Sequence, residues 1–205
     1  MGVVKLSTAG IVNYEKYSNL RAGIPLPPPA SFDLLETQVL ASSAASVSFT
    51  SLSTYAADYQ HLQLRIVARS ARSSTSSDMY LKFNGDAGAN YSQHYMRGDG
   101  SAMESANLQI SGTNGIRMYQ TLTAATNTAN SFAATVVDII NPFESTKNTT
   151  ARFLSGFTGS LNRVLLESGA WLSTDAVTSI TLTEYLGSNI VTGSRFSLYG
   201  YGKGA

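Results

Sequence analysis

The chain has 205 residues, of which 43% are hydrophobic and only 13% are charged, and its formal net charge is +1. So small a charge provides no long-range field to attract nucleic acid, anionic lipid or an acidic substrate. Cysteine is absent, which excludes disulfides, thiolate metal sites and a cysteine nucleophile. A surface with so few charges is poorly protected against association. We therefore expect much of it to be committed to neighbouring proteins.

A proline-rich segment divides the chain into two parts. The stretch IPLPPPAS, residues 24–31, contains the run Pro27–Pro29, which favours polyproline II and cannot join a central strand. We expect an anchoring arm over residues 1–24, a semi-rigid spacer over 25–31 and a single folded body over 32–205. No window approaches the ~18 consecutive apolar residues of a membrane span, and the start MGVVKLSTAG lacks the apolar core of a signal peptide.

A short amphipathic helix is predicted within the arm, over residues 10–23. Apolar residues recur there at intervals of three, and the candidate anchoring residues are Ile11, Tyr14, Tyr17 and Leu20. An isolated helix of this length is marginal in water. It needs a surface to lie on, and we expect that surface to belong to another chain.

The body is predicted to be all-β. Alternating or continuous apolar residues predict strands at 32–40, 46–52, 61–71, 79–84, 131–140, 151–157, 162–168, 178–185 and 194–202. Turn signals such as NGDAG, RGDG and LGSN separate them. The stretch 85–130 is polar and turn-rich, with ANLQI and IRMYQ as short edge strands. This pattern is typical of an antiparallel β-sandwich or jelly roll, with the first and last strands of the body both in the sheets.

The titratable residues form no recognisable catalytic motif. The two histidines, His61 and His94, show no metal-binding spacing, and no G-x-S-x-G elbow activates a serine. The acidic residues are scattered singly, whereas a glycosidase needs two facing carboxylates. We expect no enzymatic activity, no cofactor and no metal site.

Tyrosine is the commonest aromatic residue, with 11 copies against 8 phenylalanines and 1 tryptophan. Its apolar ring and polar tip suit contact surfaces and carbohydrate stacking. Tyr91, Tyr95 and Tyr119 lie in the turn-rich stretch and are the candidate surface-contact residues, although half-exposed strands account for them equally well. In the final strand, Tyr199 and Tyr201 are expected to face away from the core.

Several blocks carry a resemblance to a known group of proteins. They are FDLLETQVLASSAASVSFTSL, YQHLQLRIVARS, LKFNGDAGANYSQHYM, SGAWLSTDAVTSITLT and GSRFSLYGYGKG. In order and spacing they resemble small structural proteins of tailed bacteriophages, over nearly all of residues 32–205, and STAGIVNYEKYSNLRAG resembles the N-terminal segment of some of them. The resemblance implies a non-enzymatic component of the virion, assembled in the host cytoplasm.

Four functions remain open at this point. The first is a tail-fibre or baseplate-associated module, anchored by its arm, assembled as a homotrimer and contacting host surface glycans. The second is a capsid decoration or cement protein that clamps coat subunits. The third is a virion-associated glycan-degrading enzyme, and the fourth is a lectin-like module that needs no arm. The first two predict arm-mediated contacts with other virion proteins and differ in copy number.

Overall fold

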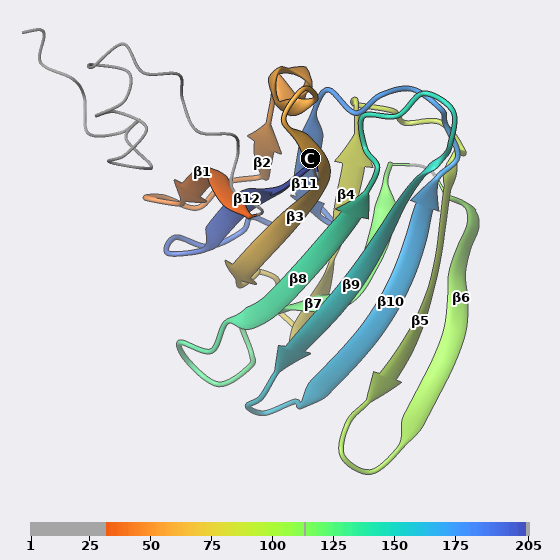
Figure 1. The fold of residues 1–205 in the computed structure, drawn as a ribbon. Helices are drawn as coiled ribbons and strands as arrows, with labels where there is room; N and C mark the ends of the chain where they lie inside the picture. The colour runs from red at the N-terminus through yellow and green to blue at the C-terminus, as the bar shows by residue number, and fades with distance from the viewer. Residues whose placement is uncertain (1–31, 113, 204–205) are drawn as a thin grey trace, which may run out of the picture.

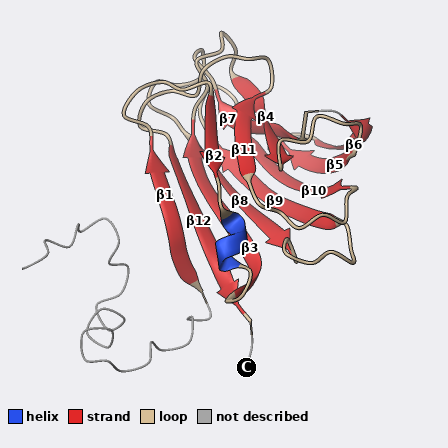
Figure 2. Ribbon diagram, turned by 90° about the horizontal axis from the view of Figure 1, so that it is seen from above, coloured by secondary structure: helices blue, strands red, loops and turns tan. Residues whose placement is uncertain are grey.

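The computed structural model describes residues 32–112 and 114–203. The predicted arm and spacer, including Ile11, Tyr14, Tyr17 and Leu20, lie outside the described residues. The described residues form twelve strands in succession (Figure 1): β1 Asp33–Val39, β2 Ser46–Phe49, β3 Tyr59–Ala68, β4 Ser76–Phe83, β5 Tyr91–Gly98, β6 Met103–Gly112, β7 Ile116–Thr123, β8 Ala133–Ile140, β9 Thr149–Phe157, β10 Arg163–Trp171, β11 Ile180–Glu184 and β12 Arg195–Gly202. A 3-10 turn, η2 Leu52–Tyr55, precedes β3 (Figure 2).

The strands form two antiparallel sheets, as predicted for a β-sandwich. The larger sheet has eight strands in the order β1-β12-β3-β8-β9-β10-β5-β6, and the smaller has four in the order β2-β11-β4-β7. Figure 1 shows β4 and β7 behind the strands of the larger sheet. β7 contacts β5, β6, β8, β9 and β10, so the smaller sheet covers only one face of the larger one.

The first and last strands of the described chain pair with each other. β12 lies between β1 and β3, so its backbone is hydrogen-bonded on both sides. Phe196 and Leu198 point into the core, and Tyr199 and Tyr201 lie on the opposite face, half-exposed. This confirms the prediction that both ends of the body are held in the sheet.

The core fills the space between the sheets. In β8, β9 and β10 every second residue is buried, as expected where one face of a sheet packs on another. The largest fully buried side chains are Trp171, Tyr91, Phe49, Phe83, Phe153 and Phe196. Within the described part of the chain, no helix has the length and apolarity to cross a membrane.

Candidate functional site: the outer face of the larger sheet

The candidate site is the outer face of the eight-stranded sheet, which points away from the smaller sheet. Two residues that pair across neighbouring antiparallel strands have their side chains on the same side of the sheet. The strand register therefore defines rows of side chains across this face. One row contains Val67, Ala134, Gly156, Val164, Gly98 and Met103, and the next contains Arg65, Val136, Leu154, Leu166, Met96 and Ser105. From here on, "the apolar face" denotes Val67, Met96, Met103, Ala134, Val136, Leu154, Gly156, Val164 and Leu166.

Large hydrophobic residues are concentrated on this side of the molecule. Met103 is 71% exposed, Val164 64% and Leu154 56%. The exposed large hydrophobic residues of the described chain are Val39, Val67, Met96, Met103, Leu154, Val164, Leu166, Leu172 and Leu186; the last two lie in loops and the other seven on outward positions of the larger sheet. Monomeric soluble proteins rarely expose apolar patches beyond a few hundred Å², and larger ones mark contact surfaces.

Small residues hollow out one part of the apolar face. Ala134 and Gly156 are direct neighbours in the register, and their short side chains leave a groove between Val67 and Val164. Its volume is about 520 Å³, and the remaining walls come from Val136, Leu154 and Arg65. The groove is therefore lined almost entirely by carbon, with no constellation of polar groups for chemistry.

An aromatic cluster closes the outer face on the side of β12. The ring of Phe32 stacks on that of Tyr199, with centroids 4.7 Å apart, and Tyr201 lies against it at 4.8 Å. The Arg65 guanidinium lies 5.1 Å from the Phe32 ring centre and 4.9 Å from that of Tyr199, within cation–π range. This cluster fixes the point at which the described chain enters β1.

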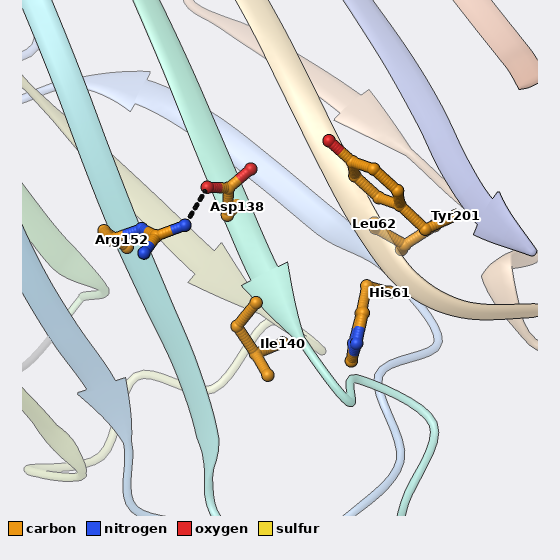
Figure 3. Close-up of a pocket in the computed structure, with 6 residues that line it drawn as sticks. All are labelled: His61, Leu62, Asp138, Ile140, Arg152 and Tyr201. Carbon is orange, nitrogen blue, oxygen red and sulfur yellow. Dashed lines mark hydrogen bonds and ion pairs between the residues drawn. The ribbon is translucent and has the colours of Figure 1, made fainter. Parts of the chain in front are cut away.

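A smaller, polar pocket of about 270 Å³ lies beside this cluster (Figure 3). Its lining is His61, Leu62, Asp138, Ile140, Arg152 and Tyr201. Arg152 Nη2 donates to Asp138 Oδ2 at 2.8 Å, and the buried Gln63 donates through Nε2 to Asp138 Oδ1 at 2.8 Å and to Tyr201 Oη at 2.9 Å. Partial burial alone would raise the pKa of Asp138, but the hydrogen bonds from Arg152 and Gln63 outweigh it and hold that pKa below its ordinary value.

The polar pocket does not assemble a hydrolytic site. His61 Nδ1 accepts a hydrogen bond from the Asn141 backbone N–H at 3.0 Å, and the described lining residues supply one carboxylate and no serine. A triad needs a nucleophile, a base and an orienting carboxylate in mutual contact. The pocket instead presents hydrogen-bond donors from Tyr201, Arg152 and Nε2 of His61. These donors surround the apolar residues Ile140 and Leu62.

The second histidine lies on the open surface of the sheet. The register places His94 opposite Ser168 on β10. Asp138 belongs to the same row of outward residues but lies on β8, two strands away from Ser168 on β10. Its carboxylate is paired with Arg152. Among the described residues, no group of three or more His, Asp or Glu side chains has the arrangement of a metal site.

The tyrosines predicted as surface contacts are placed differently by the structure. Tyr91 is fully buried, and its hydroxyl donates to the Asp86 carbonyl at 3.1 Å. Tyr95 is 3% exposed and donates to Glu104, while its ring lies 4.4 Å from the half-exposed ring of Tyr119. Tyr91 and Tyr95 therefore cannot contact a partner in the folded chain; their stretch forms strand β5, whose inward positions they occupy.

The apolar face was missed by the sequence analysis, although a signal for it existed. The predictions for β8, β9 and β10 rest on apolar runs such as Val136–Val137 and assign no residue of these strands to an outward face. Val136, Leu154, Val164 and Leu166 occupy outward positions that are normally polar in a sheet with one solvated face. Continuous apolar runs, such as Val136–Val137 and Val164–Leu166, indicate a sheet that is apolar on both faces.

No protein-family model, curated protein or solved structure matched the chain in comparisons with each of these three sets.

Proposed function

We propose that the protein is a non-enzymatic structural component of a tailed-bacteriophage virion. In this proposal it is an exterior module of the tail, in a fibre or at the baseplate, anchored through residues 1–24 and assembled as a homotrimer of jelly-roll-like sandwiches. The observation that carries the proposal is the apolar face, because exposed apolar surface of this kind marks contact sites, and covering it with another protein is favourable in water. The low charge and the resemblance of the sequence blocks to phage structural proteins support the same reading.

Capsid decoration is the alternative within the same class. A cement protein that clamps coat subunits would also use an arm and an apolar face, so these features favour both equally. Copy number separates the two, because a cement protein approaches the coat protein in abundance and a tail module stays far below it. A glycan-degrading enzyme has less support, since the polar pocket contains a single carboxylate, Asp138, among its described lining residues.

Glycan contact is a second candidate function that one feature favours. The polar pocket combines Tyr201, Arg152 and His61 as donors with the neighbouring rings of Tyr199 and Phe32, and sugar recognition uses this mixture of aromatic faces and planar polar groups. In this proposal host glycans contact the polar pocket on the outer face, and not the buried Tyr91 and Tyr95. Binding of host polysaccharide that survives Tyr201→Ala with Arg152→Ala would contradict this assignment.

Incorporation into particles tests the structural role. Mass spectrometry of purified particles is expected to detect the wild-type chain, with a copy number far below that of the coat protein. Tyr14→Ala combined with Tyr17→Ala in the full chain should lower incorporation and leave the melting temperature of the body unchanged. Absence of the wild-type chain from particles would refute the proposal, and normal incorporation of the double variant would refute anchoring through the arm.

A further inference from the structure

The apolar face has two halves of opposite shape. Over β3, β8 and β9, the small residues Ala134 and Gly156 form the floor of the groove. Over β10, β5 and β6, the exposed side chains are long: Leu166, Met96 and Met103, with Val164 at the boundary. One half is therefore hollowed and the other raised, and both are apolar.

Charge places few obstacles to burying this face. From β8 to β5 both rows consist of apolar residues or glycine, without a charged side chain between them. Asp138, in the row beside Val136, is already bound to Arg152, and Asp99, which follows Gly98, is paired with Arg163. Arg65 lies over the rings of Phe32 and Tyr199. Covering the stretch from β8 to β5 with another apolar surface thus buries no charged side chain, and burying unpaired charge is costly in interfaces. Arg195 on β12, the register partner of Val67, lies at the rim of this stretch.

The apolar face is large enough to form the centre of a protein interface. Strands lie about 4.8 Å apart and residues rise about 3.4 Å along each strand. The two rows of the apolar face take up about four residues along each of the six strands from β3 to β6 and therefore cover roughly 400 Å². A standard protein interface buries about 800 Å² on each partner, so the apolar face supplies roughly half of that area.

We propose that the apolar face binds a second copy of this chain, with the raised half of one copy, Leu166, Met96 and Met103, seated in the Ala134–Gly156 groove of the other. This inference rests on the proposed function and specifies the surface through which the oligomer forms. The partner has to be as apolar as the face itself. Among the described residues, six of the seven exposed large hydrophobic residues on strands belong to the apolar face, and the seventh, Val39, lies on the same side of the larger sheet. Groove and raised half thus complement each other between copies. Such a contact closes symmetrically into a dimer or a trimer.

Substitutions in each half test the pairing. Leu166→Arg places a charge on the raised half, and Ala134→Trp fills the groove; both side chains point to solvent in the single chain, so neither should disturb the core. Leu186→Arg is the matched control, because Leu186 is 58% exposed but lies in the turn after β11. The full-length chains are compared by analytical ultracentrifugation across the micromolar range, with thermal melting as a check on folding.

We expect the wild-type chain and Leu186→Arg to sediment as the same oligomer. Leu166→Arg and Ala134→Trp should each raise its dissociation constant at least about tenfold. A monomeric wild-type chain would overturn the inference, because the face would then be covered by another protein or by residues 1–31. An oligomer that withstands both face substitutions would overturn it as well. Failure of the proposed function would appear separately, as absence of the chain from particles whatever its oligomeric state.

Discussion

Glu167 is a carboxyl group enclosed between the two sheets. It is 2% exposed, and its Oε2 accepts from Gln93 Nε2 at 2.7 Å and from the Tyr119 backbone N–H at 2.8 Å. Burial raises the pKa of Glu167 to about 8, with a smaller contribution from the charge of Asp78 on β4, and the two hydrogen bonds offset part of the increase. Among the described residues, Oε1 of Glu167 and Oε1 of Gln93 have no hydrogen-bond partner. A proton on Glu167 Oε1 would neutralise this buried carboxyl and give the unpartnered oxygen a hydrogen to donate.

The protonated Glu167 predicts an unusual dependence of stability on pH. The folded chain keeps the proton up to about pH 8, whereas the unfolded chain releases it near the ordinary pKa of 4.5. The contribution is therefore fully present below about pH 4.5 and is lost as the pH rises to about 8, by at most about 1.4 kcal/mol per pH unit. Glu167→Gln reproduces the neutral pair without titrating.

Urea unfolding at intervals between pH 5 and 9 checks this prediction. The free energy of unfolding of the wild type, relative to that of Glu167→Gln at the same pH, should fall between pH 5 and 8 and level off above that. A relative stability that is constant over this range would show that Glu167 is ionised in the folded chain. Asp86 and Asp138, whose pKa values are lowered, contribute in the acidic range below this window.

At the scale of elements, one arginine organises the long connection between β7 and β8. Arg69 directly follows β3, is 9% exposed, and donates from Nη1 and Nη2 to the carbonyl oxygens of Ala125, Asn127, Thr128 and Ser131. The planar guanidinium spans four carbonyl groups at once, which the single ammonium group of a lysine cannot do. Arg69 thus ties the end of β3 to the loop that leads into β8.

Arg69→Lys is expected to lower the free energy of unfolding by about 2–4 kcal/mol, because several hydrogen bonds from a buried cation are lost. Arg152→Lys is the control: Arg152 is largely exposed and pairs with one carboxylate, so its replacement should cost under about 1 kcal/mol. Both are measured by urea unfolding at one pH. Equal losses in the two variants would contradict the role of Arg69.

Most strands could be predicted because their inward residues alternate with the period of a β-strand. Phe196 and Leu198 in β12 are the simplest case. ANLQI and IRMYQ were also placed correctly at sheet edges, in β6 and β7, although both strands are longer than expected. Strand β5 was missed because its inward residue Gln93 is polar, and only its hydrogen bond to Glu167, distant in the sequence, makes that burial favourable.

The candidate site could not be predicted in the same way. The apolar face exists only because the register sets Ala134, Gly156 and Val164 side by side, although they come from three strands. The polar pocket likewise joins His61 to residues of β8, β9 and β12. Alternation within one strand says which residues share a face, and the order of strands in the sheet determines which faces become one surface.

At the scale of the whole molecule, the smaller sheet buries one side of the larger sheet and leaves the other uncovered. A sandwich with a +1 net charge and a group of exposed apolar side chains on its outer face is poorly protected against association. It is well suited to packing against copies of itself. We therefore expect the apolar face to be covered in the native protein.

Methionine oxidation tests this claim without altering the chain. Of the five methionines, Met96 and Met103 lie on the apolar face and Met79 and Met118 are fully buried, while Met1 lies outside the described residues. Native protein is treated with dilute hydrogen peroxide, and sulfoxide formation at each methionine is followed by mass spectrometry, with Leu166→Arg as the uncovered reference. We predict that Met96 and Met103 oxidise nearly as slowly as Met79 and Met118 in the wild type and rapidly in Leu166→Arg. Equally rapid oxidation of Met96 and Met103 in both proteins would contradict the account.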